Sequence, residues 1–306
     1  MCNTRTKKYK TGTRCLFSWG YSPSRGKRVD QDPLLSIKVK KPMPNKFKGP
    51  YDIYKDGFCF LPSLFSQSEI SAGYKGLWSI INGKYNTGRP PENRFWNLGD
   101  SPNSIIKIDK PHICNESVWK LVTKPKFGEA LASVVNAKMV QVWHSQVVWK
   151  PKSINHSGNA GWHRDAQYWP FWSADGLYTA WIALSDVSIN SGPVRFIAGS
   201  NKWDSIEGLD FFDKNIDSQD KILDKHYKNR NIVCSTLKTG QVSIHTSLTY
   251  HSSTENKESD PRVGMVVHFC TDKAMRIPVV GENENYLDKI KDHSIAPIIY
   301  GDKIES

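Results

Sequence analysis

The sequence lacks the signals of several large protein classes. Its six cysteines are scattered without a C-x-x-C pair, which excludes the common zinc signatures and gives no disulfide framework. No apolar run approaches the roughly 18 residues of a membrane-spanning helix, and the N-terminus has no signal-peptide core. We therefore expect reduced thiols in a soluble, cytoplasmic protein without a membrane span. An organelle is the alternative if the basic N-terminus is a transit peptide.

Acidic residues are absent from the first 29 positions, which contain eight Lys or Arg. Such a segment is typical of a solvated tail, a basic arm or a transit peptide. We interpret residues 1–50, which show no helical or strand periodicity, as a basic and flexible extension. The net charge of +12 gives little further support for nucleic-acid binding, because the remaining basic residues are mixed with acids and are not interleaved with aromatics.

Residues 51–306 carry the patterns of one domain, and a 38% hydrophobic content provides enough material for a sizeable core. The segment 57–62 predicts a short strand that proline ends. Ser66 followed by Glu69 forms a capping box, which predicts a helix that runs to Gly83. A second helical pattern covers 115–137, and Pro125 must interrupt it because proline lacks an amide hydrogen and clashes with the preceding turn.

From Met139 onward the pattern changes to short strands. Many short strands between Gly, Pro, Asn and Ser turns predict an antiparallel sandwich or barrel. The insert 204–231, with a weak helical pattern at 217–227, is either a lid over a site or a solvated excursion. The predicted strands are 139–149, 177–184, 193–197, 231–237, 241–245 and 263–269.

Two histidines and an aspartate give the strongest chemical signal. On a strand, His163 and Asp165 would point the same way, because strand side chains alternate with period two. With the distant His251 they would make the two-histidine, one-carboxylate set that suits Fe(II) and leaves positions open for a co-substrate and dioxygen. A His-x-Asp pair alone is a weak signal, since most such histidines are ordinary surface or core residues. His245 and His268 are interpreted as packed, hydrogen-bonded histidines.

The surroundings of this pair resemble the phytanoyl-CoA dioxygenase family of iron(II)- and 2-oxoglutarate-dependent oxygenases. The resemblance spans about 51–269 and departs from the family at Ala198-Gly199-Ser200-Asn201 and at Gly240-Gln241. It implies a mainly β fold with flanking helices (α+β), whose double-stranded β-helix core, a jelly roll of cupin type, covers about 138–272. The matching features are Asp56-Gly57-Phe58, Leu61-Pro62, Trp162-His163-x-Asp165 with Tyr168-Trp169, Trp181, the 192–200 segment, His251-x-Ser253 and Arg262.

The resemblance also implies roles for individual residues. His163, Asp165 and His251 would be the iron ligands. Arg262 would bind the far carboxylate of 2-oxoglutarate through two parallel N–H donors, a geometry that lysine cannot reproduce. Ser253 would contribute a hydroxyl hydrogen bond to the same carboxylate, and Trp181 would line the pocket. His144 and Gln146 lie on the strand where relatives place co-substrate contacts, so they are candidates to touch 2-oxoglutarate or substrate. The alternative is a polar strand face in contact with solvent.

The activity implied is C–H bond activation, most simply hydroxylation, of a small polar or carboxylated metabolite, with Fe(II), 2-oxoglutarate and O2. Asp165 argues against halogenation, because halogenating relatives carry Ala or Gly there. Oxidative cyclisation or desaturation in specialised metabolism, as in the kainoid synthases of algae, stays open since no motif separates these outcomes. A nucleic-acid-directed oxygenase has only the basic tail in its favour, and an inactive scaffold is opposed by the complete ligand set.

Overall fold

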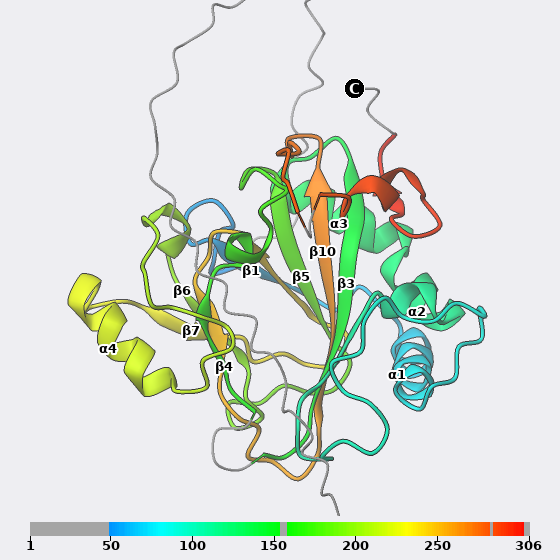
Figure 1. The fold of residues 1–306 in the computed structure, drawn as a ribbon, viewed down its shortest axis with the longest axis horizontal. Helices are drawn as coiled ribbons and strands as arrows, with labels where there is room; N and C mark the ends of the chain where they lie inside the picture. The colour runs from blue at the N-terminus through cyan, green and yellow to red at the C-terminus, as the bar shows by residue number, and fades with distance from the viewer. Residues whose placement is uncertain (1–48, 154–157, 282–283, 303–306) are drawn as a thin grey trace, which may run out of the picture. The chain divides into compact units, whose positions relative to one another are not determined.

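Two antiparallel sheets form the core of the protein in a computed structural model that describes residues 49–153, 158–281 and 284–302 (Figure 1). The expected extension 1–50 lies outside these residues except for its last two positions. The larger sheet has the order β1 (Phe58–Leu61), β8 (Val242–Thr246), β5 (Leu177–Ala183), β10 (Arg262–Thr271), β3 (Val140–Lys150), β11 (Ile298–Tyr300), and β2 (Ile106–Asp109) also pairs with β3. The smaller sheet has the order β4 (Ala160–His163), β9 (His251–Ser253), β6 (Val194–Ile197), β7 (Ile232–Cys234).

This arrangement confirms the predicted α+β class with a double-stranded β-helix core, and the predicted strands recur with small shifts at their ends. One prediction was too long: the strand expected over 231–237 is β7, which covers Ile232–Cys234. Three strands, β2, β9 and β11, were not predicted, and β4 was anticipated only as the strand that bears His163. β2 and β11 are short and lie on β3, so their strand character depends on pairing more than on their own residue pattern.

Three helices cover one face of the larger sheet. The capping box predicted α1 (Gln67–Ile81) correctly, since the Ser66 hydroxyl accepts from the Glu69 amide and the Glu69 carboxylate accepts from the Ser66 amide. The break at Pro125 is also confirmed: α2 (Glu116–Val122) ends before it, and α3 (Pro125–Val135) begins with it. Buried side chains of these helices and of the sheet form one apolar cluster.

Strand alternation separates the two faces of the larger sheet. On β10, Val263, Met265 and Val267 belong to the apolar cluster under the helices. Arg262 and Val266, at the alternate positions, line a cavity on the opposite face. Because side chains alternate along a strand, one face of β10 packs into the core and the other lines the cavity.

The insert lies against β4 of the smaller sheet. Its helix α4 (Ile216–His226) contributes Gln219, whose side chain accepts from the Trp162 amide. The Gly161 amide donates to the Phe211 carbonyl at 3.0 Å. A Cβ atom on Gly161 would meet the Asp210 carbonyl oxygen at 2.0 Å, so glycine is required for this close approach. The lid role of 204–231 stays a prediction.

Within the described ranges, no helix is both long and apolar enough to cross a membrane. Four cysteines there, Cys59, Cys114, Cys234 and Cys270, are free thiols. Cys2 and Cys15 lie outside the described residues.

Candidate metal centre

Three buried side chains converge at the smaller sheet. His163 ends β4 and His251 begins β9, and the two residues are directly opposite in the β4–β9 register. One ligand atom from each of His163, Asp165 and His251 can be chosen so that all lie within 4.8 Å of one another. The Nε2 atoms of His251 and His163 are 3.6 Å and 3.9 Å from Asp165 Oδ1. The structure therefore brings together the three residues that the sequence singled out.

The strand assignment for Asp165 was wrong. β4 stops at His163, and Asp165 is the first residue of the short 3-10 helix Asp165–Tyr168. Arg164 between them has an extended backbone, with φ −109° and ψ 139°. The alternation of side chains thus continues one residue beyond the strand, and Asp165 still faces the same way as His163. The Arg164 guanidinium points away and donates to the carbonyls of Trp203 and Asp204.

Backbone carbonyls orient both imidazoles. His163 Nδ1 is 2.8 Å from the Gly161 carbonyl and His251 Nδ1 is 3.0 Å from the Thr249 carbonyl. Because a carbonyl only accepts, the proton is on Nδ1, and the Nε2 lone pair is left for a metal ion. Burial lowers the pKa of both histidines, which keeps the imidazoles neutral as metal ligands must be.

Thr179 and His245 hydrogen-bond one oxygen of the Asp165 carboxylate. Thr179 Oγ1 donates to Oδ2 at 2.6 Å, and His245 Nε2 lies 3.1 Å from the same oxygen. Burial raises the pKa of Asp165, but His251 and His245 outweigh it and hold that pKa well below its usual value. The carboxylate is thus ionised, and Oδ1 is the oxygen that faces His163 and His251.

These observations fit an iron ion. Two neutral imidazoles and one carboxylate are the donor set of mononuclear non-haem iron sites, and three ligands leave further positions open. As expected from the sequence, His245 and His268 are buried, hydrogen-bonded histidines outside the ligand group.

A cavity of about 110 Å³ adjoins the three ligands. Both sheets and the insert line it, so its walls come from distant parts of the chain. Of the residues predicted from sequence, Arg262, Ser253, Trp181 and Gln146 line it. His144 is not among the lining residues. Its Nδ1 atom is 2.9 Å from Tyr286 Oη, and its Nε2 atom is 3.5 Å from Asp109 Oδ1.

Arg262 is a buried guanidinium without a hydrogen-bond partner in the described part of the chain. It is 3% exposed, and its Nε and Nη1 atoms are buried and unsatisfied. The Trp181 ring lies 5.1 Å from its Cζ atom. Burial lowers the pKa of Arg262 to about 10. An unpaired buried cation is costly, so these donors fit an anionic group that binds in the cavity.

Gly264 makes room for the Trp181 ring, because a Cβ atom there would lie 1.9 Å from Trp181 Cζ2. Gly264→Ala is therefore expected to displace the indole from beneath Arg262. Overpacking of this kind costs about 1–3 kcal/mol, and 2-oxoglutarate should bind more weakly. Chemical denaturation and a 2-oxoglutarate titration measure the two effects. Gly49→Ala is the matched control, since its nearest atom is a backbone oxygen at 3.9 Å, and equal behaviour of both variants would contradict the prediction.

Sequence reasoning missed several residues of this cavity. Lys107 reaches it from the unpredicted strand β2, Thr179 holds the aspartate, and Phe211 reaches it from the insert. The Phe211 ring meets the His163 ring edge to face, with centroids 5.0 Å apart. The only available signal was the alternation of Ile106, Lys107 and Ile108, which is too short to predict a strand from sequence.

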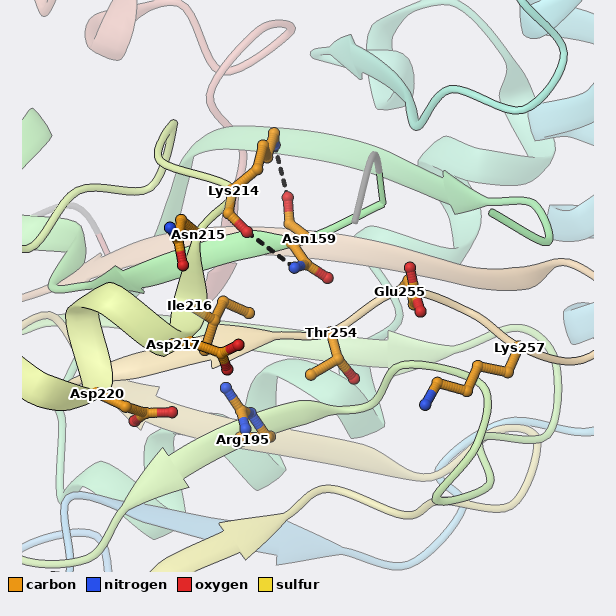
Figure 2. Close-up of a pocket in the computed structure, with 10 residues that line it drawn as sticks. All are labelled: Asn159, Arg195, Lys214, Asn215, Ile216, Asp217, Asp220, Thr254, Glu255 and Lys257. Atoms are coloured by element: carbon orange, nitrogen blue, oxygen red, sulfur yellow. Dashed lines mark hydrogen bonds between the residues drawn. The ribbon is translucent and has the colours of Figure 1, made fainter. Parts of the chain in front are cut away.

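A larger cavity of about 600 Å³ lies outside the metal centre, where α4 approaches β6 and the end of β9 (Figure 2). Charges of both signs line it, including Arg195, Lys214, Asp217 and Asp220. It contains none of the three metal-ligand candidates. The three metal-ligand candidates line the smaller cavity instead.

Comparison with known proteins agrees with this geometry. The family model described as "Phytanoyl-CoA dioxygenase (PhyH)" matches residues 53–264. The chain belongs to this family. The match covers more than half of the chain and includes the three metal-ligand candidates and Arg262. As a PhyH protein with this ligand group, it is a non-haem oxygenase that depends on iron and 2-oxoglutarate.

Individual relatives of this PhyH protein are distant. The human peroxisomal phytanoyl-CoA dioxygenase is 23% identical over 153 residues, which are 49% of this chain and 45% of that protein, so the match spans less than half of this curated relative. The carbocyclase SnoK from nogalamycin biosynthesis has a similar fold, with a TM-score of 0.62 and 18% identity over 87% of this chain and 97% of SnoK. EctD from S. alaskensis, crystallised with 2-oxoglutarate and 5-hydroxyectoine, gives a TM-score of 0.55 and 17% identity over 72% and 73% of the two chains.

Proposed function

We propose that this oxygenase activates a C–H bond of a small, carboxylate-bearing metabolite, with hydroxylation as the outcome. His163, Asp165 and His251 are the proposed iron ligands, and Arg262 with Ser253 the proposed clamp for the far carboxylate of 2-oxoglutarate. One observation carries the proposal: a single cavity holds both the three-ligand group and a buried guanidinium without a partner among the described residues.

Iron and 2-oxoglutarate, when bound, supply the oxidising chemistry with dioxygen. The chain's own residues hold and orient the reactants. Thr179 and His245 hydrogen-bond Asp165 Oδ2 and leave Oδ1 facing His163 and His251, and Arg262 provides donors for a dicarboxylate. The ligands are at most 8% exposed, so the reaction would occur away from bulk water.

The charge of the cavity supports an anionic substrate. Lys107 lines it, is half-buried and makes no ion pair among residues 49–153, 158–281 and 284–302. Burial lowers its pKa, although Asp109 and Asp165 oppose the effect. The charges of iron (+2), Asp165 (−1), 2-oxoglutarate (−2) and Arg262 (+1) sum to zero, which leaves the two cavity lysines, Lys107 and Lys150. Lys150 already donates to Ser253 and to the Thr254 carbonyl, so Lys107 is the one available to a substrate. A substrate carboxylate would pair with it.

Aromatic rings surround this lysine. Its Nζ atom lies 4.9 Å from the Phe95 ring centre and 5.0 Å from that of Phe211. Tyr168 and Phe212 contact each other nearby, and Tyr168 also contacts His163. Phe95 and Phe212 are 59% and 64% exposed, so an apolar portion of the substrate could bury them. The proposed substrate therefore combines a carboxylate with an apolar group.

Oxidative cyclisation or desaturation is the second outcome considered. The fold accommodates it, since SnoK is described as a carbocyclase, whereas EctD is described with a hydroxylated compound. Product mass separates the outcomes, because hydroxylation adds one oxygen atom and ring closure or desaturation removes two hydrogen atoms. A nucleic-acid substrate finds no support in the described residues.

The deciding experiment is anaerobic reconstitution with Fe(II) and 2-oxoglutarate, followed by a metabolite screen for substrate-coupled succinate release. We expect the weak visible charge-transfer band of an iron–2-oxoglutarate complex, and hits that carry a carboxylate. Absence of both the band and succinate release would reject the proposed function. Salt-dependent binding to DNA or RNA that disappears on deletion of 1–48 would support the nucleic-acid alternative instead.

Lys107→Met tests the substrate carboxylate. Loss of a hydrogen bond to a charged group costs about 1.5–3 kcal/mol, so the KM for a carboxylate-bearing hit should rise roughly 10- to 100-fold while 2-oxoglutarate binding is retained. The methyl ester of that hit should be a poor substrate for the parent enzyme, and its KM should be the same for the parent and the variant. Lys55→Met, at an exposed position, is the control. Equal turnover of acid and ester by the parent enzyme would refute this assignment.

A further inference from the structure

Lys150 is a buried lysine at the wall of the metal-centre cavity. It is 1% exposed, ends β3, and lies opposite Arg262 in the β3–β10 register. Its ammonium nitrogen has no carboxylate oxygen within 4.0 Å among the described residues, although Glu255 acts on it from farther away. A buried lysine without a close acidic partner is unusual, so its contacts require a reason.

Two hydrogen bonds from Lys150 join the larger sheet to the smaller one. Nζ donates to Ser253 Oγ at 2.7 Å and to the Thr254 carbonyl at 2.6 Å. Thr254 is also on the wall of the larger cavity (Figure 2). Burial and the neighbouring cations Arg262, Lys214 and Arg195 hold the pKa of Lys150 well below its usual value. Lys150 Nζ has enough N–H groups to donate to both acceptors.

The bond to Ser253 determines where the serine proton can go. A hydroxyl has one proton and two lone pairs, and here one lone pair accepts from Lys150. Ser253 donates to no group in the described part of the chain, is 6% exposed and lines the same cavity as Arg262. Its proton is therefore directed away from Lys150 and is free for an acceptor in the cavity.

We propose that Lys150 is a positioning residue for 2-oxoglutarate: it fixes the Ser253 hydroxyl as a donor, so that Ser253 and Arg262 together bind the far carboxylate. This inference rests on the proposed function of the Arg262 cavity. Lys150 acts through Ser253, and its own charge contributes little to the affinity.

A double-mutant cycle on the full-length protein tests this coupling. The dissociation constant of 2-oxoglutarate is measured for the parent, Lys150→Met, Ser253→Ala and the double variant, by anaerobic titration of the Fe(II) charge-transfer band and by calorimetry. Each single variant should weaken binding about tenfold, as expected for one hydrogen bond to a charged group. The double variant should be no weaker than Ser253→Ala alone.

Three controls make the test specific. Lys150→Gln keeps an N–H donor near Ser253 and should bind more tightly than Lys150→Met, which also separates positioning from a folding defect. Lys152→Met, at an exposed position two residues along, should match the parent. A 2-oxo acid without the far carboxylate, such as 2-oxovalerate, should bind equally to parent and Lys150→Met.

The outcomes are distinct. Unchanged affinity in Lys150→Met, or full multiplication of the two single effects in the double variant, would overturn the positioning role; the second result would assign Lys150 an independent electrostatic effect. Failure of the parent itself to bind 2-oxoglutarate would overturn the proposed function, which is a different result.

Discussion

Replacing Asp165 with alanine is expected to weaken iron binding strongly and to abolish substrate-coupled succinate formation. Asp165 supplies the only carboxylate of the three-ligand group, so its loss removes the anion that would offset the metal charge. Loss of a residue that only hydrogen-bonds a metal ligand costs roughly 10- to 100-fold in metal affinity or activity, so loss of a ligand itself should exceed this range. Anaerobic Fe(II) titration and a succinate assay measure the two losses, and His163→Ala should behave in the same way.

The fold should survive these substitutions, because the ligands lie at a cavity and the apolar cluster under the helices contains none of them. Circular dichroism and thermal unfolding verify this. His226→Ala, on the exposed surface of α4, is the matched control and should keep full activity. If Asp165→Ala or His163→Ala retained full turnover, the iron-ligand assignment would be wrong.

Arg262→Ala should weaken 2-oxoglutarate binding more than any other change outside the metal ligands. Its donors have no alternative partner among the described residues, and removing one partner of a buried charged pair costs about 2–5 kcal/mol. Iron binding should be unaffected, since no ligand atom is lost. The effect should therefore appear as a large rise in the 2-oxoglutarate dissociation constant, measured on the iron-loaded protein without oxygen.

Arg262→Lys refines this test, because lysine restores a positive charge without the two-pronged donor geometry. It should recover only part of the lost affinity. Arg89→Ala, at an exposed position, controls for a general loss of positive charge. Unchanged 2-oxoglutarate dependence in Arg262→Ala would show that another residue holds the far carboxylate.

Local signals predicted the elements that depend on local interactions. The capping box at Ser66 and the break at Pro125 are decided within a few residues of the chain, and both are seen. The β2 strand was missed for the opposite reason. Ile106–Asp109 is four residues long and is stabilised by pairing with Trp149 and its neighbours on β3, and such pairing between distant segments leaves little trace in either one.

The site shows the same division. Motif spacing brought His163, Asp165, His251 and Arg262 into one hypothesis, and the structure places them around one cavity. Sequence could not reveal that the Asp165 carboxylate is held by Thr179, because that contact joins positions 14 residues apart in an irregular geometry. Nor could it show that His144 contacts Asp109 and Tyr286, since both partners come from segments distant in the sequence.

Exchanging the 204–231 segment between relatives would replace only one side of its tight contact with β4. The strand that ends in His163 touches this segment through the amide of Gly161 and has no room for a side chain at that position. A new segment with a different backbone path would press on β4 and shift the imidazole. Chimeras made to alter substrate preference should therefore take residues 161–168 from the same protein as the 204–231 segment. The iron-ligand candidates His163 and Asp165 then keep the backbone contacts that position them.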